Sequence, residues 1–134
     1  GMSDTGETGT GMFSLTEGTI NFASNGVEIG DISTTGDLTM NGNITAYSDS
    51  RLKKDLLPII SALSKVMTLT GYTYTRIDSG ERHTGLLAQD VQKVLPEAVQ
   101  ENAEFLTVAY GNMLGLIVES IKELNMKIDA LGNK

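Results

Sequence analysis

The chain has 134 residues, a formal net charge of −7 at pH 7, one histidine and no cysteine. Without cysteine it can form neither disulfides nor thiolate metal sites, and a single histidine argues against a histidine metal cage or a Ser-His-Asp triad. The length allows one domain of about 100–200 residues, or a small domain with an appendage. A multidomain enzyme and zinc chemistry are therefore excluded, and neither a metal nor a cofactor is expected.

Charge divides the chain near residue 47. Residues 1–47 contain six acidic residues and no lysine or arginine, whereas residues 48–134 contain eleven acidic and ten basic residues. The first part lacks the clustered basic side chains that nucleic acid and anionic membranes require, so neither is expected as a partner. No apolar stretch approaches the length of about 20 residues that spans a bilayer.

Three six-residue units follow one another over residues 30–47, with the template Gly-(Asp/Asn)-(Ile/Leu)-(Ser/Thr)-x-x. Glycine before Asp or Asn favours a turn with positive φ, and the aliphatic residue with its hydroxyl neighbour favours a very short strand. Upstream, residues 19–22 and 27–29 alternate with the period of two expected of half-buried strands. We expect residues 12–47 to form a β-rich stem fragment, and residues 1–11 to be a tag remnant and flexible segment.

The three aliphatic side chains of these hexads cannot stabilise the segment alone. Burying each one contributes roughly 1.5–3 kcal/mol, whereas ordering each residue costs about 1–2 kcal/mol of backbone entropy. The segment either caps a longer single-chain β-helix or winds around one axis with identical segments of other chains. The second arrangement is favoured because partner chains supply the missing core, and a disordered linker is the remaining alternative.

Residues 48–134 are predicted to be richer in helix. Apolar residues recur at helical spacing from Pro58 to Leu69, and Gly71 ends this helix. Residues 72–77 and 83–87 are predicted to form a hairpin, followed by a short helix over 88–95 and two short strands near 98–100 and 105–109. The predicted fold class is α+β.

The last helix has the most regular apolar pattern in the chain. The a and d positions of three heptads are all aliphatic: Leu114, Ile117, Ile121, Leu124, Ile128 and Leu131. This spacing predicts a coiled-coil seam shared with other copies of the chain. The alternative is an amphipathic helix packed on its own domain, because three heptads are the lower limit for a coiled coil.

At the junction of the two parts, a serine and a lysine stand five residues apart, Ser48 and Lys53. A lysine amine can act as general base toward a serine hydroxyl without a histidine. An ordinary lysine has a pKa of about 10.4, so the chemistry requires burial that favours the neutral amine. Taken alone, the pair also fits a capping residue followed by a solvated basic turn.

Residues 48–56, Ser-Asp-Ser-Arg-Leu-Lys-Lys-Asp-Leu, resemble the Ser-Asp-x-Arg-Leu-Lys-x-(Asn/Asp)-Ile opening of the endosialidase-type intramolecular chaperone domain. This self-cleaving domain is the C-terminal module of phage tailspikes, tail fibres and neck appendages. The resemblance continues through the strand at 72–74, the segment 85–91 and the helix at 121–124, and covers residues 48–134. Leu56 stands where the family usually has Ile, which conserves side-chain volume.

The resemblance implies a homotrimer in which each chain has two identical partners. The module at 48–134 would template a triple-β-helix-like stem, the upstream part of its own parent protein, and then release itself. Ser48 is implied as the nucleophile and Lys53 as the general base, with the scissile bond between Tyr47 and Ser48. Attack within the chain, by transfer of the acyl group from N to O, and attack by the Ser48 of a neighbouring chain both stay open.

Asp49, Arg51 and Gln89 are candidate supporting residues of this site, and Lys54 is the alternative base. The implied location is the phage virion, reached by a precursor that assembles in the bacterial host cytoplasm and loses the module after cleavage. A non-catalytic structural trimerisation tip of a viral fibre is the alternative function.

Overall fold

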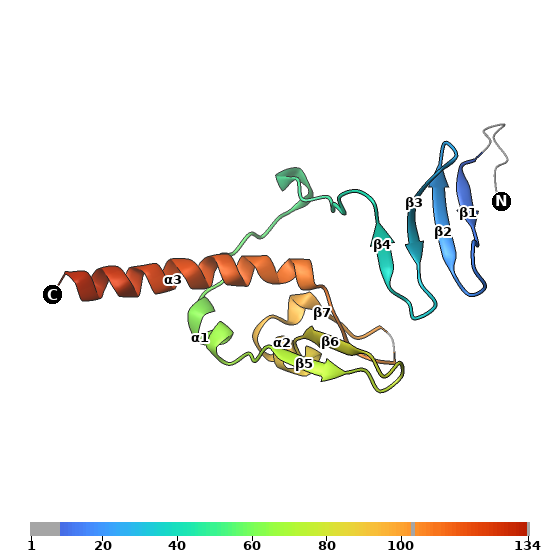
Figure 1. Cartoon of the computed structure of the whole chain (residues 1–134). Coiled ribbons are helices and arrows are strands. Elements are labelled where there is room, and N and C mark those ends of the chain that lie inside the picture. The colour runs from blue at the N-terminus through green and yellow to red at the C-terminus, as the bar shows by residue number, and fades with distance from the viewer. Residues whose placement is uncertain (1–8, 103, 134) are drawn as a thin grey trace. The chain divides into compact units, whose positions relative to one another are not determined.

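The computed structural model describes residues 9–102 and 104–133 of the chain. The chain divides into two compact units, Gly1–Lys53 and Lys54–Lys134. The first unit contains a small antiparallel sheet, and the second combines helices with two pairs of short strands (Figure 1). The α+β class and the long C-terminal helix are as predicted. The division falls after Lys53, whereas the sequence placed the boundary after Tyr47.

The sheet of the first unit is a meander in which each strand pairs with the next in sequence. Its strands are β1 (Gly11–Phe13), β2 (Ile20–Ser24), β3 (Val27–Ile32) and β4 (Leu38–Met40). β2 and β3 confirm the two strands predicted upstream of the hexads. The flexible segment was predicted over residues 1–11; residues 1–8 lie outside the described part of the chain, and Gly11 already belongs to β1.

The three hexads do not form three equivalent short strands, contrary to the expectation. The first continues β3, the second supplies β4, and the third, residues 42–47, contains no strand. Gly36 has the positive φ that its turn requires, +89°. Gly30 instead lies within β3, where an added Cβ would lie 2.7 Å from the carbonyl oxygen of Thr39, so its role is to let β3 and β4 approach closely.

This sheet has little core of its own. Asn21 and Gly30 are its buried residues, whereas the aliphatic side chains of Ile20, Val27 and Leu38 are 45%, 63% and 55% exposed. A sheet whose aliphatic residues face solvent gains little from the hydrophobic effect. The single-chain sheet therefore agrees with the expectation that the hexads cannot supply a stable core alone.

The second unit contains three α-helices and two strand pairs in its described residues. Its elements are α1 (Ala62–Met67), β5 (Tyr72–Thr75), β6 (Arg82–Gly85), α2 (Ala88–Val94), η2 (Pro96–Ala98), β7 (Val99–Gln100), β8 (Thr107–Val108), η3 (Tyr110–Met113) and α3 (Leu114–Gly132). Both strand pairs are antiparallel. The hairpin, the short helix α2, the two short strands and the long last helix confirm the predicted order of elements.

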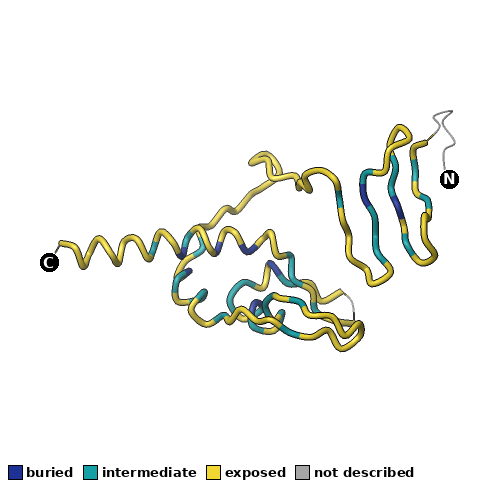
Figure 2. The backbone as a smooth tube through the Cα atoms, in the orientation of Figure 1, coloured by how far each residue is buried: buried dark blue, intermediate teal, exposed yellow. Residues whose placement is uncertain are grey.

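A small core holds these elements together. Its buried side chains come from five different elements: Ala62, Val91, Ala98, Met113 and Leu116. Partly buried apolar residues pack around them, among them Ile59, Val66, Leu86 and Val108. Figure 2 shows that burial in α3 is confined to its N-terminal half, and residues 124–133 are all exposed. The second half of α3 therefore contributes nothing to the core of its own chain.

Two predicted elements are shorter than expected, each for a local reason. The helix predicted from Pro58 begins only at Ala62, because Ser61 has the left-handed backbone conformation with a φ of 53°. β6 ends at Gly85 because the backbone N–H of Leu86 donates to the hydroxyl of Tyr110 at 3.0 Å rather than to β5. The spacing of apolar residues predicts neither the late start of α1 nor the early end of β6.

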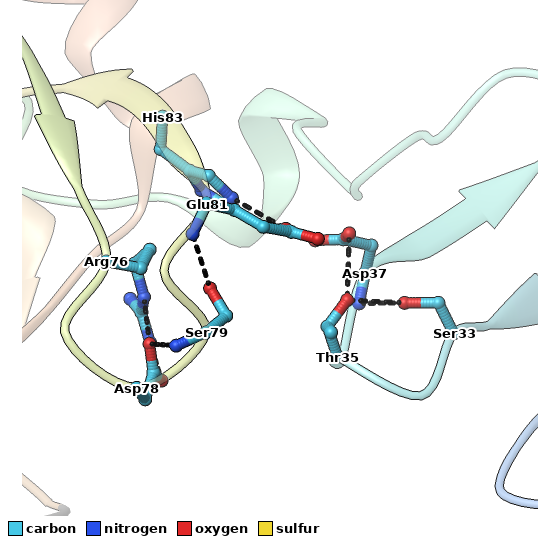
Figure 3. A network of polar contacts seen from close by, with 8 residues as sticks. All are labelled: Ser33, Thr35, Asp37, Arg76, Asp78, Ser79, Glu81 and His83. Carbon is cyan, nitrogen blue, oxygen red and sulfur yellow. Dashed lines mark hydrogen bonds and ion pairs between the residues drawn. The ribbon is translucent and has the colours of Figure 1, made fainter.

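Side-chain hydrogen bonds close a turn in each unit, and Figure 3 labels the residues involved. In the first unit the backbone N–H of Asp37 donates to the hydroxyl of Ser33 at 3.0 Å. In the β5–β6 hairpin, Arg76 binds the two carboxylate oxygens of Asp78 at 3.0 and 2.6 Å. These hydrogen bonds lower the pKa of Asp78 to about 2. The hairpin turn is thus held by charged side chains rather than by apolar packing.

Candidate functional site

Ser48 and Lys53 lie on either side of one 3-10 turn, η1 (Ser50–Leu52). The backbone N–H groups of Leu52 and Lys53 donate to the carbonyl oxygens of Asp49 and Ser50 at 3.0 and 3.1 Å. The turn brings the lysine side chain back to the serine, so that Lys53 Nζ lies 2.6 Å from Ser48 Oγ. The structure therefore brings together the two side chains that the sequence selected as a nucleophile and a base.

Asp49 caps this turn. Its Oδ1 accepts a hydrogen bond from the backbone N–H of Arg51 at 2.9 Å, which satisfies a donor that the short helix leaves without a partner. A short acidic side chain at this position favours such local bonds to the backbone, because it reaches the next amides without strain. The Ser-Asp-x-Arg portion of the motif thus specifies the turn that positions Lys53.

The side chain of Arg51 also binds Asp49. Its Nε donates to Oδ1 at 3.1 Å and its Nη2 donates to Oδ2 at 2.9 Å. These hydrogen bonds hold the pKa of Asp49 below its ordinary value, and the same pairing raises the pKa of Arg51. Two of the three supporting residues that the sequence selected therefore lie at the site.

The whole segment is exposed in the single chain. Residues 41–58 are all exposed, and Tyr47, on the other side of the expected scissile bond, is 96% exposed. Leu52, within the turn, is 68% exposed. The isolated chain thus provides the geometry of a Ser–Lys pair without the burial that its chemistry needs.

The heptad seam of α3 is also exposed. Its six a and d residues are between 39% and 67% exposed. The helix packs on its own unit through a neighbouring face, which carries Leu116 and Ser120, both buried, and Glu123, partly buried. α3 therefore packs on its own unit, as the alternative predicted, while its six a and d residues stay exposed, and a coiled-coil seam shared with other copies stays a prediction.

The other residues selected from the sequence lie elsewhere. Gln89 is an exposed residue of α2, in the second compact unit, and Lys54 is the exposed first residue of that unit. Neither makes a side-chain hydrogen bond among those found in the described residues. The arrangement thus favours Lys53 over Lys54 as the partner of Ser48.

Sequence reasoning missed a role of Glu123. One of its carboxylate oxygens accepts hydrogen bonds from the backbone N–H groups of Ala62 and Leu63 at 2.5 and 3.2 Å, and so caps α1 from α3. The capping residue lies about sixty residues from the helix that it caps, and Ser61, at the N-cap, makes no side-chain cap. No local sequence signal could have indicated this contact.

Neither a metal site nor a membrane span is found in the part of the chain that the structure describes. It contains no group of three or more histidine or acidic side chains placed to hold a metal ion. None of its helices combines the length and apolar character needed to cross a membrane.

A serine and lysine in contact at the head of a helix-rich module agree with the class of domain that the sequence resembles. Residues 48–100 match the model of the peptidase S74 family, described as the chaperone of endosialidase. The match begins at Ser48, the first residue of the candidate site. Residues 48–100 thus belong to this family, and the resemblance stated from the motif at 48–56 is confirmed.

Curated relatives extend the similarity to the rest of the chain. The long tail fiber protein Gp37 of Enterobacteria phage K3 is 33% identical over 144 aligned positions, which cover 96% of this chain and 12% of that protein. Gp37 of Enterobacteria phage T2 gives the same identity and covers 96% of this chain and 11% of that protein. Myelin regulatory factor homolog 1 of Caenorhabditis elegans is 32% identical over 110 positions, 73% of this chain and 12% of that protein. The chain thus spans about an eighth of the length of each of these three relatives.

Proposed function

We propose that residues 48–134 are an intramolecular chaperone that trimerises, templates the β-stem of its own parent protein and then releases itself by cutting between Tyr47 and Ser48. The observation that carries the proposal is the contact between Lys53 Nζ and Ser48 Oγ at 2.6 Å, immediately beside the expected scissile bond. The family match supports the chaperone role, and the phage tail fibre relatives support a place in a virion tail after assembly in the host cell.

The exposed seam of α3 supports the trimer. Six aliphatic side chains at heptad spacing face solvent in the single chain, and a parallel coiled coil would bury all of them. Burying one such side chain contributes roughly 1.5–3 kcal/mol, so the seam would supply most of the driving force that the small core of the module lacks. The a and d residues alone do not settle the number of copies, because Ile at a with Leu at d favours a dimer whereas Leu114 and Ile117 at the first pair favour more copies. The number three is what the family resemblance implies.

Assembly also supplies what the catalytic pair lacks. A neutral lysine amine 2.6 Å from the serine hydroxyl would accept its proton, whereas a solvated ammonium cannot. Apolar side chains around the pair, including Tyr47 and Leu52, are exposed in one chain and are the surface that partner chains would cover. Covering them removes water from the amine and favours its neutral form, which makes cleavage depend on assembly.

The cleavage step follows from the position of the serine. Lys53 takes the proton of the Ser48 hydroxyl while the oxygen attacks the carbonyl carbon of Tyr47. The C–N bond to Ser48 then breaks, and the proton moves from Lys53 to the leaving nitrogen. The resulting ester is hydrolysed by water, which leaves a carboxylate on Tyr47, a free amine on residue 48 and the hydroxyl restored.

The same chemistry can occur within one chain or between two. Within a chain, Ser48 attacks the carbonyl carbon directly before its own nitrogen through a five-membered ring; between chains, it attacks the Tyr47 carbonyl of a neighbour. Mixed trimers of wild-type and Ser48→Ala chains distinguish the two. Attack between chains predicts that the alanine chain is cut, and attack within a chain predicts that it stays whole.

Intact-mass spectrometry of wild-type and Ser48→Ala chains tests the proposal. We expect fragments 1–47 and 48–134 from the wild type and a whole chain from the variant. A trimeric wild-type chain that stays whole under all conditions would instead select the alternative function, a structural trimerisation tip with an inert serine and lysine.

A further inference from the structure

The carboxylate of Asp49 makes more hydrogen bonds with Arg51 than the turn requires. The bond from the backbone N–H of Arg51, at 2.9 Å, is sufficient to cap η1. The two further bonds, from Nε and Nη2, bind the guanidinium across both carboxylate oxygens. The side chains of Arg51 and Asp49 are 87% and 44% exposed, so this pairing adds little to stability, and we look for its role in its effect on neighbouring groups.

Asp49 is the residue next to Ser48 and caps the turn that leads to Lys53, so its carboxylate belongs to the same six-residue segment as the Ser48–Lys53 pair. An ionised carboxylate beside a lysine favours the protonated amine, and a protonated amine cannot accept the proton of a serine. A guanidinium bound across the carboxylate makes the Asp49–Arg51 unit neutral overall. Arginine suits this task because it stays protonated at every pH of interest and matches both carboxylate oxygens.

We propose that Arg51 is a positioning residue that neutralises the Asp49 carboxylate, so that Lys53 can give up its proton and accept that of Ser48 once the site has assembled. The inference rests on the proposed function, because it assigns the means by which the Ser48–Lys53 pair is tuned. It gives the two positions a joint role: Asp49 builds the turn, and Arg51 cancels the charge that the turn introduces.

The other charged groups next to the pair are Lys54 and Asp55, which follow Lys53 in the chain. No ion pair joins Lys53 to an acidic side chain in the described part of the chain, where the acid beside Ser48 is committed to Arg51. The segment is exposed along residues 41–58, and no helix or strand of the first unit covers it. Asp49 and Arg51 are therefore the charges to vary.

The test is the pH dependence of cleavage in the full chain. Wild-type, Asp49→Asn, Arg51→Gln and doubly substituted chains are refolded at pH 6, checked for assembly and transferred to buffers between pH 6 and 10. The first-order rate of formation of fragment 48–134 is measured in each buffer. The pH at which the rate rises reports the loss of the proton from Lys53, whereas a merely structural role would lower the rate at every pH without moving this point.

The two single variants are expected to shift the pH at which the cleavage rate rises in opposite directions. Arg51→Gln leaves the carboxylate unpaired, favours the ammonium and moves the rise to higher pH by about 0.5 unit or more. Asp49→Asn leaves an unpaired guanidinium, disfavours the ammonium and moves the rise to lower pH by a similar amount, about 0.5 unit. In the double variant, the pH at which the rate rises should return close to the wild-type value. In Arg51→Lys, which keeps the positive charge but cannot bind both carboxylate oxygens, this pH should lie between the values for wild type and Arg51→Gln.

Shifts in the same direction for both single variants, or rate changes with no shift, would overturn the inference while leaving the proposed function intact. A wild-type chain that assembles and never cleaves would instead refute the proposed function. In that case, acetylation of Lys53 by acetic anhydride against pH, followed by peptide mass spectrometry with Lys54 as internal reference, still decides the inference. Opposite shifts of the Lys53 profile in the two variants support it, and unchanged profiles reject it.

Discussion

The contact between Ser48 and Lys53 could be predicted from the sequence, whereas the exposure of the two side chains could not. The motif at 48–56 contains both residues, and the capping preference of Asp49 explains why five residues of separation become a contact of 2.6 Å. The exposure of the pair in the single chain could not be predicted, because the motif does not indicate which surfaces the rest of the chain covers. The sequence also gave no indication that Glu123 caps the start of α1, because Glu123 and Ala62 lie about sixty residues apart in the chain.

Replacing the proposed base with an arginine tests whether the amine must lose its proton. Lys53→Arg keeps a positive donor near Ser48, but a guanidinium is not deprotonated in proteins, so cleavage should fall by at least about 100-fold. The trimer should still form. Fragment 48–134 on a denaturing gel measures the outcome.

Lys54→Ala is the matched control for that experiment, because Lys54 is the adjacent lysine and makes no hydrogen bond with Ser48 in the described structure. It should cleave at the wild-type rate. Loss of cleavage in Lys54→Ala together with normal cleavage in Lys53→Arg would transfer the role of base to Lys54.

The hairpin turn gives a prediction for pH. The pKa of Asp78 is lowered to about 2 by its hydrogen bonds with Arg76, so the folded state favours the ionised carboxylate. The contribution of this pair to stability is present above the ordinary aspartate pKa of about 3.9 and is lost as the pH falls through about 2. An NMR titration of the Asp78 carboxyl carbon should find its midpoint near 2, and a midpoint near 3.9 would contradict the pairing.

Among the elements, α3 shows best what periodicity can and cannot reveal. Heptad spacing predicted a seam, and the seam is exposed in the chain. The spacing could not show that the helix also packs through a second face, where Leu116 and Ser120 lie, because one helix can serve two interfaces. The start of α1 escaped prediction for a different reason: the backbone at Ser61 is left-handed, and apolar spacing carries no information on that.

The seam prediction can be tested with a matched pair of charged substitutions. Ile121→Glu places a carboxylate at an a position and should convert the trimer to monomers, since three charges would have to be buried together. Met126→Glu places the same charge at an exposed position off the seam, 62% exposed, and should leave the trimer unchanged. Sedimentation equilibrium measures both, with circular dichroism as a check on folding, and equal behaviour of the two variants would refute the seam.

The contact between α1 and α3 also gives a prediction. Glu123→Ala removes the acceptor for two backbone N–H groups and should lower the free energy of unfolding by about 1–2 kcal/mol. Glu119→Ala, which breaks an ion pair with Lys122 in which the two side chains are 25% and 66% exposed, should change it by less than about 0.5 kcal/mol. Denaturant unfolding of the two variants measures this difference, and equal losses would show that Glu123 acts only as a surface charge.

For the whole molecule, cleavage has a physical purpose under the proposed function. While the module is attached, the stem can unfold and refold on its template. After release, the stem can no longer refold on the module, so the barrier to unfolding alone preserves it. The sequence predicted the two parts and their order. The aliphatic residues of the single-chain sheet are exposed, so under the proposed function the final form of the stem would depend on partner chains.

Kinetic trapping predicts a difference between cleaved and uncleaved assemblies. The stem of the wild-type trimer should lose its trimeric band in warm detergent at least about tenfold more slowly after cleavage than the stem of a Ser48→Ala trimer. Gel electrophoresis at a series of incubation times measures the two rates. Identical rates would show that release of the module does not stabilise the stem.

Native mass spectrometry of the freshly assembled wild-type chain tests the central claim most directly, because it records the number of copies and the integrity of each chain together. We predict a trimer whose chains on denaturation separate into fragments 1–47 and 48–134. A monomer, or a trimer of whole chains that never divides between Tyr47 and Ser48, would contradict it.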